Sequence, residues 1–402
     1  MTFQTFTGME YLQIDIANNF GKDKLNWDER IEWFKQNENQ LDNLLKSAEN
    51  PALFFAGVQA YRKAKAGQPS GYPISLDGCS SGLQILACLT TDRMAASLCN
   101  VVDTGHREDA YTAVYQAMAE YIGESGKITR SQCKEAIMTA LYGSLAVPKR
   151  VFGEGKLLQV FHDAMNLMTP HAWNLNEAFL EIWNPEAMKY TWTLPDNFHV
   201  HTKVKALVAE DFHFKNAPEQ AVHEVNMPTA KGRSLGANTV HSIDGYIVRE
   251  ISRRCMFNPE QLLRVKTALC YFGEPEAQDT EAGRMVQTLW NHYEKTGMLS
   301  ARIFDYLDED TVGLLPDRQP VWELIYSLPR KPFQVLSIHD CVRVLPNYGN
   351  DVRRQYNNLL AEVAKGNLLN TLLSEITGRE INIPKVDPDM WKDVKVTNYA
   401  LS

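Results

Sequence analysis

Apolar and polar residues alternate along the segment YPISLD, residues 72–77. A period of two is typical of a strand that buries one face against a core. We therefore predict a strand here, with Asp77 at its end on the opposite face. Gly78 and Gly82 allow close backbone approach in the turn that follows. An apolar run comes next, and we expect a helix over residues 83–98.

Apolar residues spaced three and four apart predict that most of the chain is helical. Residues 1–50 are predicted to be mostly helical, with a helix start capped by Asn26 or Asp28. Thr129 has the capping-box spacing to Gln132 at the start of another helix. The other predicted helices cover residues 51–66, 108–122, 129–142, 157–168, 176–183, 239–254, 351–364 and 368–376.

Short alternating segments predict a few further strands. Residues 192–207 suit a hairpin or an extended pair, residues 224–227 suit a short strand, and residues 232–238 suit a loop. Residues 332–337 are predicted as a buried strand, and residues 341–345 as its antiparallel partner. Together these elements predict an α+β fold that is mainly helical.

Length and composition are those of an ordinary soluble globular protein. The chain has 402 residues, of which 44% are hydrophobic and 22% charged, which suggests two or three domains or subdomains. Residues 255–330 have the character of an insertion, with helices separated by acidic segments at 274–281 and 308–310. No apolar run approaches the roughly 18 residues that a membrane span needs. The N-terminus lacks the basic and apolar regions of a secretory signal.

Cysteine usage and net charge indicate the redox compartment and the kind of nucleic-acid binding to expect. The seven cysteines are odd in number and scattered without a CxxC pair, which favours reduced thiols in a cytosol over a disulfide framework or a zinc site. The net charge of −8 argues against nonspecific coating of nucleic acid. A basic cleft on an acidic body remains compatible with that sum, because local potential governs binding.

One predicted helix carries a regular series of functional side chains. Arg130, Lys134, Met138 and Tyr142 follow at steps of four, with Gly143 after them, so they share one helical face. Two cations at this spacing can grip successive phosphates of a triphosphate, and the tyrosine ring can lie against a base. A solvated basic face that runs into a core tyrosine is the other interpretation of the same spacing.

Two aspartates lie at strand ends. Asp77 beside open backbone suits a hard cation such as Mg²⁺, although most such aspartates cap a helix or sit in a solvated turn. His339 and Asp340 occupy the turn between the two C-terminal strands, where an Asx turn with a surface histidine is, in isolation, the more common arrangement. If Asp77 and Asp340 converge, they can hold two Mg²⁺ ions about 3.5–4 Å apart, the arrangement for in-line phosphoryl displacement.

These three segments resemble motifs A, B and C of the single-subunit RNA polymerases of phages and mitochondria. The matching stretches are LDGCSSGLQ around Asp77, RSQCKEAIMTALYG from Arg130 to Gly143, and HDC at 339–341. The resemblance implies magnesium ligation by Asp77, Asp340 and the Gly78 carbonyl. It also implies triphosphate binding by Arg130 and Lys134, and a base and translocation role for Tyr142 beside Gly143.

Further matches extend the resemblance over nearly the whole chain. His241 in NTVHSIDG is similar to the histidine beside the incoming ribose, and Tyr111 to a tyrosine of the nucleotide pocket. Residues 11–39 resemble the region before motif A, where Lys24 is similar to a lysine near the phosphates. The stretch between His241 and His339 is not covered.

The resemblance also implies a sugar preference. Related DNA polymerases carry a glutamate five residues after the first aspartate, which blocks a ribose 2′-hydroxyl, whereas this chain has Gly82. They typically carry phenylalanine four residues after the motif B lysine, whereas this chain has Met138. His241 adds a hydrogen-bond partner for the 2′-hydroxyl, so ribonucleotides are the expected substrates.

The resemblance implies a right-hand polymerase divided between chains. Its regions are palm at 1–120, fingers at 121–240, an insertion at 241–331, and palm with a C-terminal foot at 332–402. The thumb, the N-terminal domain and the DxxGR element find no match, and the short segment between Tyr142 and His241 puts the promoter-specificity loop in doubt. A second subunit is therefore expected to supply the missing parts in a heterodimer.

The implied partners are a DNA template, nascent RNA, nucleoside triphosphates and accessory factors for promoter recognition. No membrane is expected, and the implied location is the cytoplasm of an infected bacterial host. Two rival hypotheses are a DNA polymerase or primase of the same palm superfamily, and a nonenzymatic nucleic-acid-binding subunit that retains a decayed palm.

Overall fold

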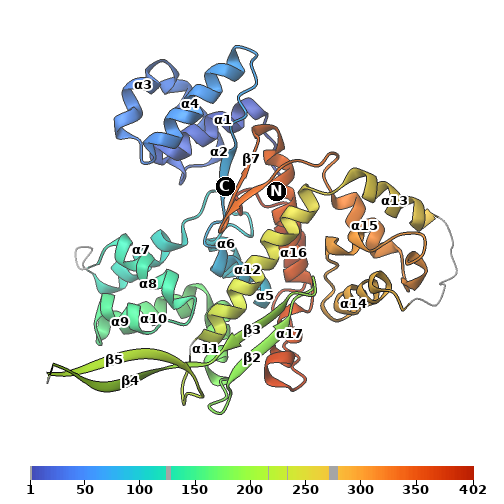
Figure 1. The fold of residues 1–402 in the computed structure, drawn as a ribbon. Coiled ribbons are helices and arrows are strands. Elements are labelled where there is room, and N and C mark those ends of the chain that lie inside the picture. The colour runs from blue at the N-terminus through green and yellow to red at the C-terminus, as the bar shows by residue number, and fades with distance from the viewer. Residues whose placement is uncertain (1, 124–127, 216, 233, 271–278) are drawn as a thin grey trace.

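The computed structural model describes residues 2–123, 128–215, 217–232, 234–270 and 279–402. The chain is mainly helical with small antiparallel sheets, as predicted (Figure 1). The helices are α1 (Gly8–Ala17), α2 (Trp27–Asn37), α3 (Leu41–Leu44), α4 (Pro51–Lys65), α5 (Ser81–Thr90), α6 (Arg93–Leu98), α7 (Ala110–Ile122), α8 (Arg130–Ala140), α9 (Ala146–Phe152), α10 (Lys156–Met168), α11 (Pro170–Glu181), α12 (Ser234–Cys255), α13 (Pro259–Cys270), α14 (Glu281–Thr296), α15 (Gln319–Ser327), α16 (Gly349–Lys365), α17 (Leu368–Thr377) and α18 (Met390–Val394). The strands are β1 (Ile74–Asp77), β2 (Lys189–Thr193), β3 (His199–Lys203), β4 (Lys205–Phe214), β5 (Ala217–Asn226), β6 (Leu336–Ile338) and β7 (Cys341–Val344).

A three-stranded antiparallel sheet lies at the centre, in the order β1-β7-β6. It joins segments far apart in the sequence, because Asp77 of β1 pairs with Cys341 of β7 and Ile338 of β6 pairs with the same cysteine. The predicted alternation in β1 is confirmed, since Ile74 and Leu76 are buried and Asp77 is exposed. The chain end runs beside β1, where Ser402 exchanges backbone hydrogen bonds with Asp77.

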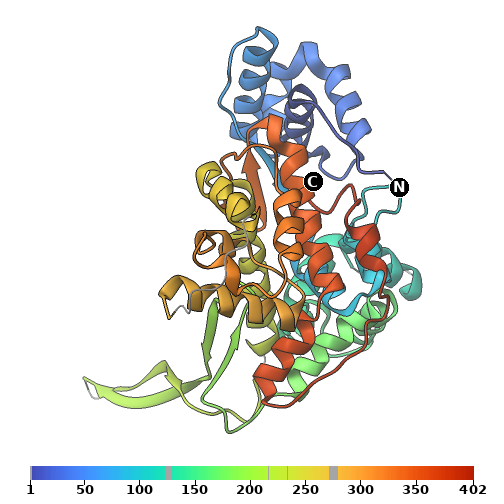
Figure 2. The same cartoon turned by 90° about the vertical axis from the view of Figure 1, so that its right-hand side faces the viewer.

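Helices surround this sheet in separate groups. The group α1–α4 stands above it and α7–α10 lie to one side (Figures 1 and 2), while α5, α12 and α16 pack against one another. Residues 81–89 of α5 are all buried, as their apolar run predicts. The capping predictions hold: Asn26 caps α2, and the Thr129 backbone N–H donates to Gln132 Oε1 at 2.8 Å at the start of α8.

The segment between α11 and α12 forms two hairpins. Strands β2 and β3 pair as the predicted hairpin, and β5 is longer than the predicted strand at 224–227. Strands β4 and β5 form a ribbon that projects away from the body of the molecule (Figures 1 and 2). Nearly every side chain of the ribbon is exposed, including the apolar Leu207 and Phe214.

The predicted insertion folds around an apolar core of its own, built from α13, α14, α15 and the turns at 299–315. A buried ion-pair network ties it to the rest of the chain. Arg254 of α12 donates to Glu250 and to both carboxylate oxygens of Glu362 on α16, at 2.6 and 2.8 Å. Glu250 in turn accepts the Ala301 backbone N–H at 2.9 Å. Residues 274–278 of the predicted acidic loop lie outside the described residues.

Two helix predictions were wrong in their bounds. The helix expected over 83–98 breaks at Thr91, which adopts a left-handed φ of 51°, and α6 starts afresh after Asp92. The buried Asp92 carboxylate accepts N–H groups from Ala95 and also from His171 and Ala172. It therefore caps α6 and α11 together, which is why α11 begins at Pro170, well before the predicted residue 176.

Two further predictions failed because tertiary contacts overrode local signals. The loop expected at 232–238 is helical from Ser234, since Leu235 is buried and Gly236 packs closely on Phe179. The buried strand expected at 332–337 is instead an exposed edge strand over 336–338. Phe333 is buried there outside any strand, stacked on Tyr348 with ring centroids 4.4 Å apart.

A search of the described helices for one long and apolar enough to cross a membrane found none.

Candidate active site

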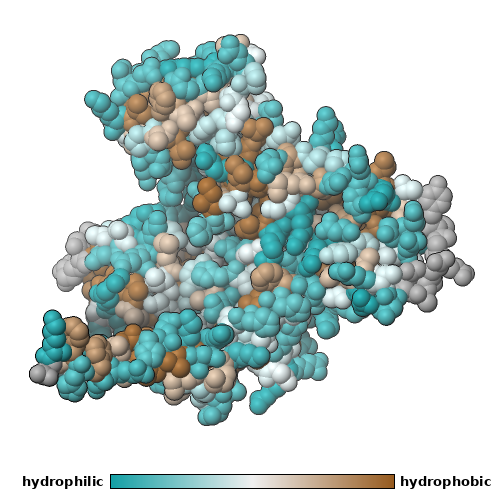
Figure 3. Space-filling view, in the orientation of Figure 1, coloured by the Kyte–Doolittle hydropathy of each residue, from teal (hydrophilic) through white to brown (hydrophobic). Residues whose placement is uncertain are grey.

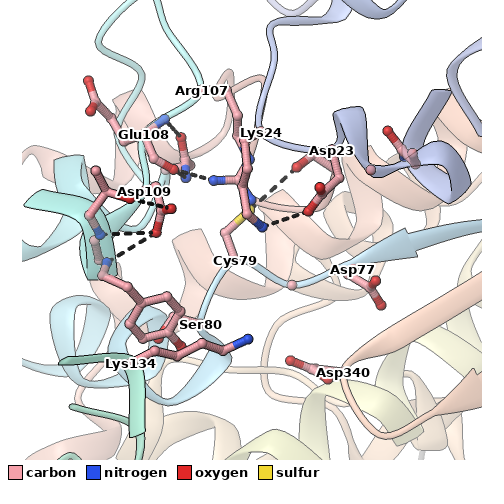
Figure 4. A pocket seen from close by; sticks show the side chains of 18 of the residues that line it. Asp23, Lys24, Asp77, Cys79, Ser80, Arg107, Glu108, Asp109, Lys134 and Asp340 are labelled. Carbon is pink, nitrogen blue, oxygen red and sulfur yellow. Dashed lines mark hydrogen bonds and ion pairs between the residues drawn. The ribbon is translucent and has the colours of Figure 1, made fainter. Parts of the chain in front are cut away.

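The central sheet brings Asp77 and Asp340 together. Asp77 ends β1, and Asp340 lies in the two-residue turn between β6 and β7, where His339 adopts a left-handed φ of 56°. The Gly78 backbone N–H donates to the Asp340 carbonyl oxygen at 3.2 Å, which fixes one strand end against the other. Both carboxylates face the same open space (Figure 4).

That space is a cavity of about 930 Å³. It opens where the surface is hollowed between the N-terminal helices and α7–α10 (Figure 3). The predicted site residues that line it are Lys24, Asp77, Gly78, Tyr111, Arg130, Lys134, Met138 and Asp340. The fold therefore gathers candidates from four separate stretches of sequence into one cavity: Lys24, residues 77–78, residues 111–138 and Asp340.

The electrostatics of the cavity favour a bound cation at the two aspartates. Burial raises the pKa of the Asp340 carboxyl, and the negative charge of Asp77 raises it further. The available donors are carboxylate and carbonyl oxygens, which suit a hard cation such as Mg²⁺. Within the described residues no three His, Cys, Asp or Glu side chains converge on one point. Water and phosphate oxygens would complete the coordination, as is usual for Mg²⁺.

Arg130 is held in place by the N-terminus of α7. Its Nε donates to Thr112 Oγ1 at 2.8 Å and to Asp109 Oδ2 at 3.1 Å, and its guanidinium forms an ion pair with Asp109. Burial alone would raise the pKa of Asp109, but hydrogen bonds from Thr112 and Arg130 outweigh it, so the pKa is lowered. Arg130 thus reaches the cavity as half of an ion pair.

The two lysines differ in their surroundings. Lys24 Nζ forms an ion pair with Asp23 at 2.6 Å on the N-terminal side of the cavity (Figure 4). Lys134 Nζ lies 5.8 Å from the centre of the Tyr111 ring, and burial raises the pKa of Tyr111. Among the described residues no carboxylate forms an ion pair with Lys134, so its charge is available to a ligand.

Tyr142, Gly82 and His241 form a niche next to the cavity. The Tyr142 and His241 rings lie 4.5 Å apart at 33°. A Cβ added at Gly82 would lie 2.7 Å from Tyr142 Oη, so the space beside this glycine is filled by the phenol. Burial raises the pKa of Tyr142 to about 12. Gly143 follows α8 with a φ of 81°, a conformation that favours glycine.

Sequence reasoning missed two carboxylates of the site. Asp109 holds Arg130, and its spacing to Thr112 is that of an N-cap, which could have revealed it. Asp244 lies one turn beyond His241 on α12, close enough for the charge of Asp340 to raise its pKa. Helical spacing from His241 was the signal for that residue.

The comparison with protein families gives the class to which this arrangement is similar. Residues 4–176 match the family described as DNA-dependent RNA polymerase. The matched segment contains Asp77, Lys134 and Tyr142 but ends before His241 and Asp340. These two residues reach the site through the fold.

Individual relatives agree with that class. The chain is 28% identical over 177 residues to the mitochondrial DNA-directed RNA polymerase of Neurospora crassa, covering 36% of this chain and 12% of the relative. It is 26% identical over 172 residues to the DNA-directed RNA polymerase of Pseudomonas phage phiKMV, covering 34% of this chain and 21% of the relative. The aligned part is thus a small share of each relative's length. These similarities support the enzyme class of DNA-directed RNA polymerase.

Proposed function

We propose that the chain is the catalytic subunit of a DNA-dependent RNA polymerase, which adds ribonucleotides to the 3′ end of an RNA. One observation carries the proposal: the sheet brings Asp340, outside the matched segment, beside Asp77 within it. Both carboxylates share a cavity with Lys134, whose charge has no carboxylate partner among the described residues.

Asp77, Asp340 and the Gly78 carbonyl are the proposed ligands of two Mg²⁺ ions. Bound there, Mg²⁺ would activate the RNA 3′-hydroxyl and neutralise charge on the departing pyrophosphate. The protein's own contribution is to hold two repelling carboxylates at adjacent strand ends. The backbone hydrogen bond from Gly78 to Asp340 fixes that arrangement before any ligand arrives.

The cations on the other side of the cavity would bind the triphosphate. Lys134 is the most available of them, Arg130 is oriented by Asp109, and Lys24 approaches from the N-terminal helices. Positioning and charge stabilisation by such groups supply most of the catalysis in phosphoryl transfer. Tyr111, over which Lys134 lies, is the proposed floor of the nucleotide pocket.

The niche of Gly82, Tyr142 and His241 would receive the sugar and base. Gly82 leaves room for the Tyr142 ring, and His241, whose ring is tilted by 33° against that of Tyr142, offers a hydrogen-bond partner to a 2′-hydroxyl. Tyr142 would pack against the base and, followed by the flexible Gly143, gate translocation.

The proposed architecture is a palm at 1–120 and 332–402, fingers at 121–240, and an insertion at 241–331. A second subunit is proposed to supply the thumb, the N-terminal domain and the DxxGR element. This resembles the larger, catalytic subunit of the two-subunit RNA polymerase II of N-four-like coliphages. The complex would act on a DNA template in the cytoplasm of an infected bacterium, with accessory factors for promoter recognition.

Substitution of Asp340 by asparagine tests the proposal. The change keeps shape and removes charge, so RNA synthesis by the assembled enzyme should be lost, while the urea midpoint of the chain should not fall, because repulsion from Asp77 is removed. Asp310→Asn, at an exposed loop residue, is the matched control and should retain full activity. Synthesis by Asp340→Asn at the wild-type rate would refute the assignment.

Two further comparisons separate the rival functions. Preference for ribonucleotides over deoxyribonucleotides is expected, and the opposite preference would indicate a DNA polymerase. The chain alone should make little RNA because it lacks a grip on the hybrid, whereas long transcripts from it would argue against a second subunit. Absence of magnesium-dependent synthesis in the assembled complex would favour a nonenzymatic role.

A further inference from the structure

Asp244 is a carboxylate beside the site to which the proposed mechanism gives no role. It lies on α12, three residues after His241 and therefore on the same helical face. Its side chain is half-buried, and its Oδ2 accepts a hydrogen bond from Ser81 Oγ at 3.4 Å. In the part of the chain that the structure describes, neither a lysine nor an arginine forms an ion pair with it.

The surroundings of Asp244 destabilise the charged form of its carboxylate. Burial raises the pKa of Asp244 to about 6, and the negative charge of Asp340 contributes in the same direction. Removing a charge from water without a cationic partner is unfavourable. Titratable side chains with strongly shifted pKa values are concentrated at functional sites.

Ser81 connects Asp244 to the niche around Tyr142. It is the buried first residue of α5 and immediately precedes Gly82, on which Tyr142 Oη rests. Hydrogen bonding from Ser81 also acts on the Tyr142 phenol and on the Asp340 carboxyl, lowering the pKa of each. The Ser81 hydroxyl, which donates to Asp244, therefore also lies near the Tyr142 phenol and a reaction-centre aspartate.

We propose that Asp244 is a positioning residue, which acts through the Ser81 hydroxyl to hold the Tyr142 ring between Gly82 and His241. Two contacts from α12 then fix the ring: the tilted His241 ring packs against it, and Asp244 orients the serine beside its oxygen. Because Tyr142 lies in the niche proposed for the sugar, Asp244 also sets how strictly ribose is selected. The effect of Asp244 on sugar selection rests on the proposed polymerase function, whereas the positioning of Tyr142 does not.

Oxidation of Tyr142 by hydroxyl radicals, followed by peptide mass mapping, tests the positioning directly, because this reaction follows ring exposure and not ionisation of the phenol. Ser81→Ala and Asp244→Ala should each raise the Tyr142 oxidation rate several-fold, and the double variant should raise it no further, because both remove one hydrogen bond. Asp244→Asn keeps an acceptor for Ser81 and should stay near the wild-type rate. The exposed Tyr326 is the internal reference.

The same variants are then compared for sugar selection in the assembled enzyme. The ratio of ribonucleotide to deoxyribonucleotide incorporation should fall roughly tenfold in Ser81→Ala and Asp244→Ala, the effect of losing one charge-assisted hydrogen bond. Asp211→Asn on the exposed ribbon is the matched control.

The outcomes separate this inference from the proposed function. Unchanged Tyr142 oxidation in Ser81→Ala and Asp244→Ala, or equal oxidation in Asp244→Asn and Asp244→Ala, would overturn the positioning role. An unchanged sugar ratio in an active enzyme would overturn the link to sugar selection. If the wild-type complex makes no RNA while oxidation changes as expected, the proposed function fails and the positioning role stands.

Discussion

Gly82 and Tyr142 depend on each other at the level of single atoms. The glycine lies in the first turn of α5, where alanine would ordinarily stabilise a helix by about 0.5–1 kcal/mol. Here a Cβ would come within 2.7 Å of Tyr142 Oη, too close for both to keep their places. Glycine is therefore required at position 82 because Tyr142 occupies the space of a side chain. The backbone conformation of residue 82 does not itself require glycine.

The first prediction is a coupling between these two residues. Gly82→Ala should destabilise the wild-type chain by roughly 1 kcal/mol or more, because the phenol must move. In a Tyr142→Ala background the same change should be neutral or stabilising, since the clash is gone. Urea denaturation of the four proteins in the cycle measures this. Equal effects of Gly82→Ala in both backgrounds would contradict the packing described.

A second residue-scale prediction concerns Asp15, which joins α1 to β1. It is buried and accepts hydrogen bonds from the Ser75 N–H and the Tyr72 hydroxyl, each at 2.8 Å. Burial raises the pKa of Asp15 from 3.8 to about 6. Because the folded state holds this proton more tightly than the unfolded chain, the free energy of unfolding should fall as pH rises from about 4 to about 6.

Asp15→Asn removes this pH dependence while keeping an acceptor for Ser75. Relative to wild type, the variant should gain on the order of 2 kcal/mol in free energy of unfolding between pH 4 and pH 6. Urea denaturation of both proteins across that window gives the difference directly. A difference that stays constant from pH 4 to pH 6 would show that Asp15 titrates as it does in the unfolded chain.

The sequence named most of the residues that the fold gathers around the cavity, and their roles stay predictions. Resemblance to the polymerase motifs pointed to Asp77, Lys134, Tyr142 and Asp340, because chemistry constrains residue type and short-range spacing together. Asp244 was not predicted: its helical spacing from His241 is a weak signal by itself, and its contact with Ser81 is made across the fold.

At the scale of elements, the ion-pair network around Arg254 joins the insertion to the rest of the chain. Arg254 has no exposed surface, and its partners lie on α12 and α16. Removing a buried partner leaves uncompensated charge behind, which is much more costly than loss of a surface pair.

The third prediction compares a buried and an exposed arginine. Arg254→Met should lower the free energy of unfolding by roughly 3 kcal/mol, because Glu362 loses its cation and Glu250 keeps only its ion pair with Arg253. Arg284→Met, which breaks an exposed ion pair with Asp279, should cost less than about 1 kcal/mol. Denaturant titrations of both variants provide the comparison. Similar costs for the two would mean that the Arg254 network contributes no more than a surface pair.

Helices and strands were predicted best where their ends carry local signals. Thr129 with Gln132 marked α8, and the alternation before Asp77 marked β1. The failures at 232–238 and 332–337 have a common cause, since burial against distant residues such as Phe179 and Tyr348 decided the local structure. Short windows of sequence do not contain that information.

At the scale of the whole molecule, the site exists because four distant segments meet. The family match ends at residue 176, yet the carboxylate of Asp340 faces the same cavity as that of Asp77. From the sequence alone, the meeting of Asp77 and Asp340 was a hypothesis. Pairing of β1 with β7 supplies the convergence physically, and the surrounding helices place Lys24, Arg130 and Lys134 around the same cavity.

Addition of a single ribonucleotide to an RNA primer annealed to a DNA template tests the central claim most directly. The assembled enzyme is given this scaffold, which removes the need for a promoter, and Asp77→Asn is compared with wild type in the presence of Mg²⁺. Template-directed extension by wild type and a rate lower by roughly 10³-fold or more in the variant are expected, because one of two charged ligands is gone. Extension by Asp77→Asn at the wild-type rate, or none by the wild-type complex, would contradict the account.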